Sequence, residues 1–471
     1  MSQLEAMSNA DTAWLHMDQP TNLMVVCGVM VLDRRLTADR LKQILRDRLL
    51  QFDRFRQRVV EDGGAPAWEE DPLFDLDAHV HRIGLPAPGG QRELEEVVAD
   101  LLATPLDPSK SPWQVHLVDR FGKGSAMIMR LHHCIADGIA LVRVLLSMTD
   151  TAPHLRRPRP ETDNPLWALF RPAAAVATAA TAAAQALLHE GVELFRHPPH
   201  AMEIAREGVD VARTLARLAL LPPDSDTIFR GPLGVKKRVA WVGGTRLADV
   251  KHVGHALGAT VNDVLLCALA GALRRYLRDR RRPVSGVDIR LVVPVDLRPI
   301  EDVPRLGNHF GLVFVDLPVG IRDAAARLQE IVRRTQAMKH SLDAPLAFAM
   351  LQAIGMASAP AEHQLLDAFS SKATMVVTNV PGPRKKLYLG GAGLARMMFW
   401  VPQSGRIGLG LSILSYDHEV SVGITADAGL VPDPQLLLRG MREELTALAK
   451  IAAASRRRRA PRRKGRGVRA R

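Results

Sequence analysis

The chain has 471 residues, of which 47% are hydrophobic and 24% are charged. These are ordinary globular proportions, so they exclude a wholly disordered chain, a collagen-like repeat and a disulfide scaffold. The formal net charge is +13, but residues 456–471 hold ten basic residues and no acidic one; the remaining residues number 53 basic and 50 acidic, a net charge of +3. The basic character therefore belongs to the tail and does not by itself indicate a nucleic-acid-binding domain.

The cysteines and the N-terminal residues indicate where in the cell the protein is expected. The three cysteines, Cys27, Cys134 and Cys267, are far apart and form no CxxC pair or zinc-ligand spacing. We therefore expect reduced thiols and a cytoplasmic location. The N-terminal segment shows no signal-peptide pattern. The longest uncharged stretch, 172–188, is alanine-rich and too short and weakly apolar to predict a membrane span.

Apolar runs and helical periodicity alternate in the first third of the chain. The predicted elements are buried strands at 24–32, 115–118 and 125–133 and helices at 36–52 and 139–148. Such alternation predicts a mixed αβ domain in which helices cover a sheet. We assign residues 1–152 to this N-terminal domain.

Residues 153–235 have a different character and are assigned to a linker. Four prolines fall between 153 and 165, and two helical segments are predicted at about 167–196 and 201–220. The second segment has one polar stripe and an otherwise apolar surface. Because the charges of that stripe cancel, we expect its apolar face to pack on the protein's own core rather than on a membrane.

A second αβ pattern occupies residues 236–454, and residues 455–471 predict a disordered basic tail. The predicted elements are helices at 260–276 and 433–454 and strands at 288–295, 312–317, 374–379, 407–415 and 418–425. The length of the chain, at roughly 100–200 residues per domain, agrees with two such domains.

The segment 125–148 carries the clearest chemical signal. It places His132 and His133 before Asp137 and Gly138, an HHxxxDG pattern between a predicted buried strand and a predicted helix. Side chains alternate along a strand, so two adjacent histidines point apart and cannot easily bind one metal. No HExxH pattern supplies a further ligand, and no metal site is expected.

The same alternation separates the two histidines by environment. His133 ends the more apolar face, which carries Met127, Met129 and Leu131, whereas His132 shares its face with Arg130. A histidine on an apolar face is most often a satisfied core residue. The complete pattern in its context favours a catalytic His133 and a structural His132.

Asp137 immediately precedes the predicted helix. It can be a helix N-cap. Alternatively, it can hold the segment from His132 to Asp137, the histidine loop, by pairing with an arginine, for which Arg56 and Arg298 are candidates. The helix N-terminus beside His133 would favour a neutral imidazole, which a general base requires.

HHCIADG resembles the HHxxxDG signature of the CoA-dependent acyltransferases, a superfamily that includes chloramphenicol acetyltransferase, plant alcohol acyltransferases and peptide-synthetase condensation domains. Other segments narrow the resemblance to the bacterial wax ester synthase/diacylglycerol acyltransferase family, from about residue 4 to 453. They are MSNADTAWLHMDQPTNLMVV, PLDPSKSPWQVHLVD, KKRVAW, GATVNDVLLCALAGALR, RLVVPVDLRP, LGNHFGLVFVDLPVG, SKATMVVTNVPGP and FWVPQSGRIGLGLSILSY. The resemblance implies two chloramphenicol-acetyltransferase-like αβ domains, a helical linker and a central tunnel that CoA and acceptor enter from opposite faces.

The resemblance also assigns site residues. His133 matches the family's general base, and His132, Asp137 and Gly138 match the remaining positions of the motif. Asn262 and Asp263 match the family's Asn-Asp pair, which can shape the active site or simply begin a helix capped by Thr260.

Other segments that carry motif residues or turn residues are expected to be structural. The family's Pro-Leu-Trp triplet reads Ser111-Pro112-Trp113 here, and we expect the change to leave the chemistry intact. The literal Pro-Leu-Trp at 165–167 lies in the linker and is interpreted as coincidental. Gly307-Asn308 and residues 378–383 are interpreted as turns.

The implied reaction is acyl transfer from fatty acyl-CoA to a lipid alcohol. A thioester is already activated, so no covalent acyl-enzyme is expected, and acyl-CoA is a co-substrate rather than a cofactor. The chain lacks the GxSxG of serine hydrolases. Cys134 is a poor candidate nucleophile, since its side chain should point away from that of His133. Asn262 or a backbone N–H could stabilise the oxyanion.

The acceptor and the tail leave alternatives open. Diacylglycerol is the favoured acceptor, a long-chain fatty alcohol or both acceptors come second, and amide-forming condensation is more distant. A non-catalytic membrane-binding or nucleic-acid-binding protein is the alternative class, and the intact HHxxxDG pattern counts against it. The tail is a solvated appendage or contacts anionic lipid at the inner membrane or on lipid droplets, and lipid is favoured over nucleic acid.

Overall fold

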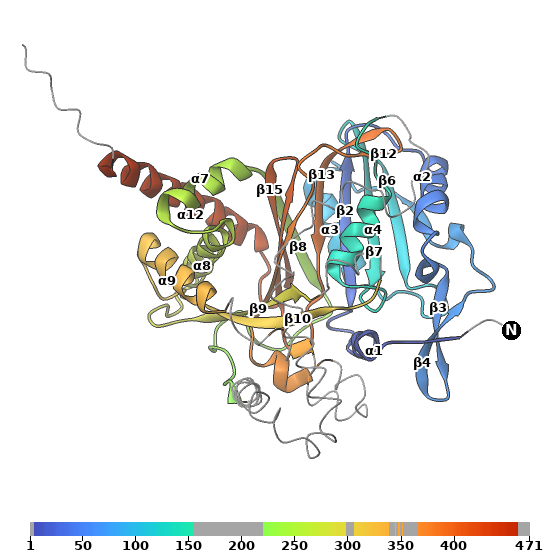
Figure 1. The fold of residues 1–471 in the computed structure, drawn as a ribbon, viewed down its shortest axis with the longest axis horizontal. Helices are drawn as coiled ribbons and strands as arrows, with labels where there is room; N and C mark the ends of the chain where they lie inside the picture. The colour runs from blue at the N-terminus through green and yellow to red at the C-terminus, as the bar shows by residue number, and fades with distance from the viewer. Residues whose placement is uncertain are drawn as a thin grey trace, which may run out of the picture.

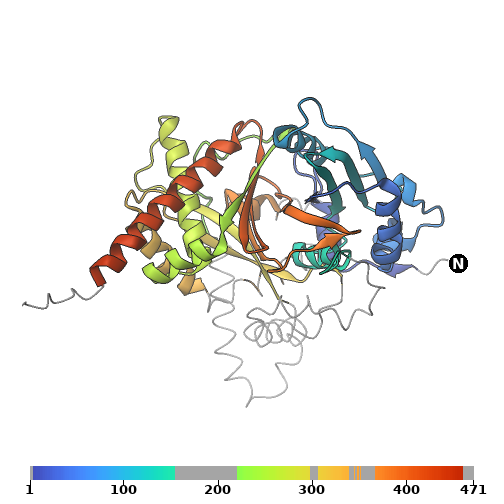
Figure 2. The same cartoon turned by 90° about the horizontal axis from the view of Figure 1, so that it is seen from above.

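In the computed structural model, two αβ halves lie side by side (Figures 1 and 2). The structure describes residues 4–153, 220–297, 306–338 and 366–459, together with 344, 347, 348 and 351. Apart from residue 220, the two helices predicted in the linker lie outside the described residues, as does the Pro-Leu-Trp at 165–167.

A six-stranded sheet with the order β12-β13-β2-β7-β6-β5 forms the core of the first half. β2 (Val25–Leu32) and β7 (Gly124–His132) are antiparallel neighbours within it, and every residue of both is buried. Their near-continuous apolar sequence suits strands covered on both faces. The other strands are β5 (Val80–Ile83), β6 (Trp113–Phe121), β12 (Tyr388–Leu389) and β13 (Ala392–Trp400).

Different helices cover the two faces of this sheet. α4 (Gly138–Ser147) packs in the same hydrophobic cluster as Met127 and Met129 of β7. α3 (Gln91–Leu102) packs in the cluster that contains Ala126 and Ile128. The alternation predicted for residues 125–133 is therefore confirmed.

The second half is built on a sheet with the order β10-β9-β11-β14-β15-β8. Its helices lie on the side away from the first half (Figure 2). The strands are β8 (Lys237–Arg246), β9 (Ile289–Asp296), β10 (Phe310–Leu317), β11 (Met375–Pro381), β14 (Leu409–Tyr416) and β15 (Glu419–Asp427). The helices are α7 (Leu247–Leu257), α8 (Val261–Asp279), α9 (Ala324–Met338) and α12 (Pro434–Arg459).

The predicted elements are confirmed with small changes at their ends. Each predicted strand matches an observed strand within three residues at either end. The helix predicted at 36–52 is α2 (Ala38–Ile44), continued by a π-helical turn at Leu45–Leu49. The tail predicted as disordered from residue 455 is wrong in its first residues, because α12 continues to Arg459. Alanine and arginine are strong helix formers, and basic residues suit a helix C-terminus.

A hairpin from the second half of the sequence completes the first sheet. β12 and β13 come from the second half of the sequence but complete the first sheet, where β13 pairs with β2 from Leu394↔Leu32 to Trp400↔Cys27. The boundaries predicted at 152, 235 and 454 stay predictions, but residues 388–400 belong structurally to the first half. A hairpin shared in this way ties the halves together.

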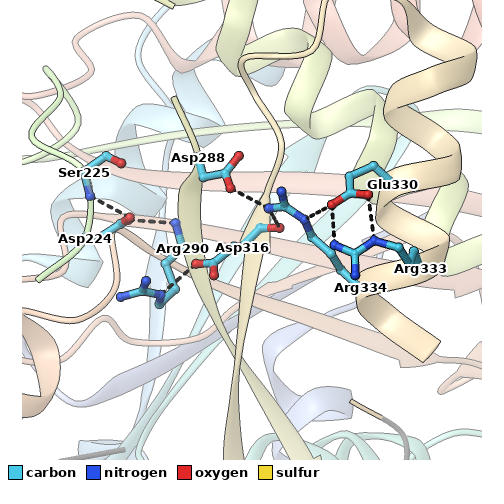
Figure 3. A network of polar contacts seen from close by, with 8 residues as sticks. All are labelled: Asp224, Ser225, Asp288, Arg290, Asp316, Glu330, Arg333 and Arg334. Atoms are coloured by element: carbon cyan, nitrogen blue, oxygen red, sulfur yellow. Dashed lines mark hydrogen bonds and ion pairs between the residues drawn. The ribbon is translucent and has the colours of Figure 1, made fainter. Parts of the chain in front are cut away.

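A polar network holds α9 against the edge of the second sheet (Figure 3). Arg290 of β9 donates from Nε to Asp316 of β10 at 2.7 Å and from its backbone to Asp224 at 2.7 Å. Arg334 of α9 donates to Asp288, just before β9, at 2.7 Å. These contacts orient β9 and β10, which extend toward the first half.

The N-terminal segment forms a short strand and then a helix, and the helix lies at the junction of the halves. β1 (Glu5–Ala6) pairs with β4 (Ala65–Glu70), which pairs with β3 (Gln57–Asp62). α1 (Asn9–His16) follows, and the Ser8 hydroxyl caps it by accepting the backbone N–H of Asp11 at 3.1 Å. The cap fixes where α1 starts and therefore where its side chains meet the first sheet.

Among the described residues, no single helix combines the length and hydrophobicity needed to cross a membrane. α7 and α8 meet the requirement only as a pair bent by 93°.

Candidate active site

His133 lies directly beyond the end of β7. Its backbone N–H donates to the carbonyl of Met24 at 2.7 Å, which continues the pairing of β7 with the chain before β2. The residue is 5% exposed, and Met129 and Leu131 precede it on the same face. The imidazole therefore stands at the end of an apolar stripe.

Two aromatic residues from distant parts of the chain enclose the imidazole. Trp14 of α1 stacks on it, with ring centroids 4.2 Å apart and planes at 23°. Phe310, the first residue of β10, approaches with a centroid distance of 5.8 Å. His133 is thus held where α1, β7 and β10 meet, at the junction of the two halves.

This environment keeps the imidazole neutral. Burial lowers the pKa of His133 to about 4, and the neighbouring His132 acts in the same direction. The Asp137 carboxylate and the Asn308 side chain oppose the shift but do not overcome it. Its Nδ1 is buried and has no hydrogen-bond partner among the described residues. At neutral pH the ring is therefore able to accept a proton.

Asp137 joins the histidine loop to the second half. Its Oδ1 accepts the N–H of Ala140 at 3.0 Å, which caps α4, and its Oδ2 accepts the N–H of His309 at 3.1 Å. Its own N–H donates to the carbonyl of Gly307 at 3.3 Å. Gly138 follows as the first residue of α4. The N-cap interpretation of Asp137 is confirmed.

The proposed pairing of Asp137 with Arg56 is wrong. Arg56 instead donates to Asp53, to Glu70 and to the carbonyl of Leu50. Leu50 and Asp53 lie within six residues of Arg56, Glu70 ends the neighbouring strand β4, and the two carboxylate contacts are exposed. Arg298 lies outside the described residues.

Asn308 fixes the backbone of His133. Its Nδ2 donates to the carbonyl of His133 at 2.8 Å and to Oδ1 of Asp11 at 2.7 Å, and its backbone N–H donates to the same Asp11 oxygen at 3.1 Å. Burial raises the pKa of Asp11, and the hydrogen bonds from Asn308 oppose that shift. The interpretation of Gly307-Asn308 as a turn is wrong, because Gly307, with a φ of 112°, pairs with Ala136 in an isolated β-bridge. It misses the buried bonds by which Asn308 links α1 to the histidine loop.

His132 points away from His133, as strand alternation predicts. Its Nδ1 accepts the N–H of Cys134 at 3.2 Å, and its Nε2 lies 3.6 Å from Oδ1 of Asp18. These contacts hold the turn after β7. They agree with a supporting role for His132, which stays a prediction.

Asn262 and Asp263 begin α8. Asp263 forms a capping box with Thr260, accepting its N–H at 2.8 Å, and also accepts the hydroxyl of Thr335 at 2.7 Å. Asn262 accepts a longer hydrogen bond, 3.4 Å, from Asn379. Among the described residues, no hydrogen bond joins either side chain to His133. The structural interpretation accounts for Asp263, and active-site shaping by Asn262 stays a prediction.

The Ser111-Pro112-Trp113 triplet behaves as scaffold. The carbonyl of Pro112 accepts the N–H of His132 at 2.9 Å, and the indole N–H of fully buried Trp113 donates to the carbonyl of Phe55 at 2.9 Å. Within the described part of the chain, no group of three or more His, Cys, Asp or Glu side chains is arranged to hold a metal ion.

Comparison with family models shows the family to which the chain belongs. Residues 7–265 match the wax ester synthase/diacylglycerol acyltransferase catalytic domain, and residues 306–449 match the C-terminal domain of the same family. The chain belongs to the wax ester synthase/diacylglycerol acyltransferase family. It is an acyltransferase.

Curated relatives carry names from the same family. A protein of Mycobacterium tuberculosis H37Rv with the name "Probable diacyglycerol O-acyltransferase tgs1" is 29% identical over 89% of each chain. A second protein of that strain, Rv3087, also carries the name of a diacylglycerol O-acyltransferase and is 30% identical over 96% of this chain and 98% of its own.

Solved structures share the fold. The wax ester synthase/diacylglycerol acyltransferase of Marinobacter aquaeolei VT8 matches with a TM-score of 0.69 at 22% identity, covering 95% of this chain and 100% of its own. The starter condensation domain of rhizomide synthetase, solved as a mutant in complex with C8-CoA and Leu-SNAC, matches with a TM-score of 0.60 at 14% identity, covering 96% of this chain and 94% of its own. The expected two-domain acyltransferase architecture is confirmed.

The sequence did not predict the residues outside the HHxxxDG motif that contact His133. Trp14, Asp11, Asn308 and Phe310 surround or hold His133, yet they lie far from it in the sequence. The only local signals were a tryptophan in a capped N-terminal helix and an asparagine directly before an apolar strand. Neither indicates a neighbour more than a hundred residues away.

Proposed function

We propose that this acyltransferase moves a fatty acyl group from acyl-CoA to diacylglycerol to form triacylglycerol, with His133 as general base. The observation that carries the proposal is a neutral imidazole stacked on Trp14 at the junction of the two halves. Its backbone is fixed by Asn308, and Asp137 ties its loop to the second half.

In the proposed reaction, His133 removes the proton from the acceptor hydroxyl as the oxygen attacks the thioester carbonyl. The C–O bond forms and gives a tetrahedral intermediate. Its collapse breaks the C–S bond, and the imidazolium returns the proton to the leaving CoA thiolate. Such base catalysis typically contributes 10²–10⁴ in rate. Acyl-CoA is a co-substrate in this scheme, and no covalent acyl-enzyme forms.

Asp137 supports the scheme electrostatically. Its carboxylate is among the groups that raise the pKa of His133, so it favours the imidazolium that forms as the proton is taken. Because Asp137 caps α4 and holds His309, its charge is fixed in place before the reaction begins.

Diacylglycerol is the proposed acceptor because the curated relatives carry diacylglycerol acyltransferase names. A long-chain fatty alcohol is the second candidate, since the matching structure from Marinobacter is named for both activities. Both acceptors present a hydroxyl at the end of an apolar molecule, so the proposed chemistry is the same.

Acceptor choice and the absence of an acyl-enzyme can be tested together. Purified protein is given labelled palmitoyl-CoA with dioleoylglycerol and with hexadecanol in separate reactions. We expect triacylglycerol to form faster than wax ester. A faster wax ester reaction would show that a fatty alcohol, not diacylglycerol, is the preferred acceptor. If the folded protein formed neither lipid product, the proposed function would be overturned. Intact mass after incubation with palmitoyl-CoA alone should show no palmitoyl adduct, and an adduct would refute direct transfer.

We also propose that the basic tail, 456–471, places the enzyme on anionic lipid surfaces. Each Lys or Arg near such a surface contributes about 1 kcal/mol. Since α12 continues to Arg459, the test variant keeps the helix and replaces only the six basic residues after it with serine. Because six of the ten basic residues are removed, salt-sensitive sedimentation with phosphatidylglycerol vesicles should weaken strongly, while activity on detergent-dispersed substrate persists. Unchanged sedimentation would refute this role.

A further inference from the structure

The amide of Asn308 contacts His133 with its nitrogen and leaves its oxygen unused. Both hydrogens of Nδ2 are taken, one by the carbonyl of His133 at 2.8 Å and one by Oδ1 of Asp11 at 2.7 Å. The amide oxygen, Oδ1 of Asn308, is buried and accepts no hydrogen bond among the described residues. A buried acceptor without a donor costs free energy, so its presence beside the site calls for an explanation.

The surroundings of this amide fix its orientation. A flip by half a turn would bring the amide oxygen against the carbonyl of His133 and the carboxyl oxygen of Asp11, and would leave Nδ2 without either acceptor. The backbone N–H of Asn308 also donates to Asp11, at 3.1 Å, and holds the residue in place. Oδ1 of Asn308 is therefore the unused end of a fixed amide.

The imidazole of His133 offers the matching donor. Its Nδ1 is likewise buried and has no hydrogen-bond partner among the described residues. Burial lowers the pKa of His133 to about 4, and the Asn308 side chain works in the opposite direction, as an acceptor oxygen beside the ring does. A ring nitrogen without an acceptor and an amide oxygen without a donor thus belong to two residues that are already hydrogen-bonded to each other.

Two other acceptors lie near the ring. The Asp137 carboxylate accepts the backbone N–H groups of Ala140 and His309, and Nδ1 of His133 makes no hydrogen bond to it. The carbonyl of His133 itself also favours a protonated ring, but less than the Asn308 side chain does, and it already accepts Nδ2 of Asn308. The amide oxygen of Asn308 is therefore the better placed acceptor for a proton on Nδ1.

We propose that Oδ1 of Asn308 is the acceptor for the Nδ1–H of His133 and thereby holds the tautomer whose Nε2 is free to act as base. Catalytic hydrogen bonds are often long or poorly aligned in a structure without substrates, and they tighten when substrates bind. The inference rests on the proposed function, since the tautomer matters to turnover only if His133 is the base. It makes Asn308 a positioning residue for the imidazole ring as well as for the backbone.

This tautomer fits the proton transfers of the proposed reaction. The hydrogen bond made by one ring nitrogen decides which of the two carries the proton. With Nδ1 of His133 protonated, the lone pair of Nε2 takes the hydroxyl proton, and the same Nε2 later returns that proton to the CoA thiolate. The bond from Nδ1–H to Asn308 is stronger while the ring is an imidazolium, so it also stabilises the charge that forms during the reaction.

NMR of the full chain, labelled with ¹⁵N in its histidine rings, shows the tautomer directly. The His133 signals are assigned by their absence from the spectrum of His133→Asn, and spectra are recorded at neutral pH with palmitoyl-CoA and no acceptor alcohol. Two variants separate the oxygen from the rest of the amide. Asn308→Ala removes both ends, whereas Asn308→Asp removes Nδ2 and keeps an oxygen at the position of Oδ1. Tyr416→Phe is the control, because it removes buried hydrogen bonds to Leu387 and Leu394 and leaves Asn308 intact.

In wild type and in Tyr416→Phe we expect the proton on Nδ1 of His133 and none on Nε2. Asn308→Asp should keep that tautomer, and its negative charge should move the fall of kcat/KM at low pH to higher pH, because an anion beside the ring favours the imidazolium. Asn308→Ala should carry the proton on Nε2 in at least part of the molecules. Since a wrong tautomer alone can lower kcat by orders of magnitude, kcat of Asn308→Asp should exceed that of Asn308→Ala by about ten-fold or more.

A wild-type spectrum with the proton on Nε2 of His133 would overturn the inference, and this measurement needs no variant of Asn308 to fold. A folded Asn308→Ala that keeps the proton on Nδ1 would also overturn it and would assign the hold to the carbonyl of His133. Loss of the tautomer in a folded Asn308→Asp would show that the oxygen is not what holds it. The spectra need no turnover, so the expected tautomer without any lipid product would refute the proposed function and not the contact.

Discussion

Replacing Asn308 with alanine should reduce turnover far more than an equally destabilising change elsewhere. Asn308 is 2% exposed, and its Nδ2 bonds both the carbonyl of His133 and the carboxylate of Asp11. A bond to a neutral group contributes about 0.5–1.5 kcal/mol and one to a charged group about 1.5–3, so the variant should lose roughly 2–4 kcal/mol of stability. Since Asn308 anchors the backbone of His133, we also expect about 10²-fold lower kcat, the scale of effect that a displacement near 1 Å can have.

Tyr416→Phe is the matched control. The Tyr416 hydroxyl accepts the N–H of Leu387 at 2.9 Å and donates to the carbonyl of Leu394 at 3.1 Å, so its loss also removes two buried bonds between the halves. Leu394 pairs with Leu32, eight residues along β2 from Met24, or roughly 26 Å from the site. Urea unfolding and steady-state kinetics should show a stability loss in both variants and a loss of kcat only in Asn308→Ala. Equal kcat values in the two folded variants would refute the positioning role of Asn308.

Three further outcomes follow from the site. A base with a pKa near 4 is active when deprotonated, so kcat/KM should fall only as the pH drops toward 4 and should stay level above about 6. A fall in kcat/KM that begins near pH 6.5, the acid limb of an ordinary histidine, would contradict a buried, neutral His133. Trp14→Leu uncovers the imidazole, which should raise its pKa and move that limb to higher pH, whereas an unmoved limb would show that Trp14 does not control its burial. Asp263→Ala removes the carboxylate that completes the α8 capping box with Thr260, and should cost about 1.5–3 kcal/mol with kcat retained; a ten-fold loss of kcat at a temperature where the variant is folded would assign Asp263 to the active site instead.

Local sequence patterns were sufficient to predict the strands that hold the site. β2 and β7 are continuous apolar runs, and such runs remain buried whichever sheet they join. The predicted opposition of His132 and His133 follows from strand geometry alone and is confirmed by their different partners. The N-cap at Asp137 was likewise readable from its place before a helix.

Local sequence patterns could not predict the contacts between the two halves. Nothing in the sequence of β13 shows that it joins the first sheet, because strand pairing depends on the whole topology. Asn308 looks like an ordinary turn residue until the fold brings Asp11 and His133 beside it. The assignment of Arg56 to Asp137 failed for the complementary reason, since nearby Asp53 and Glu70 offered that arginine closer partners.

The most direct test of the general-base role is the initial rate of triacylglycerol formation by His133→Asn at saturating palmitoyl-CoA and dioleoylglycerol, with folding checked by circular dichroism. Asparagine keeps a polar side chain at the position but cannot accept a proton at neutral pH. The proposed mechanism predicts a kcat about 10²–10⁴ lower than that of wild type. A folded variant that forms triacylglycerol at the wild-type rate would show that His133 is not the base.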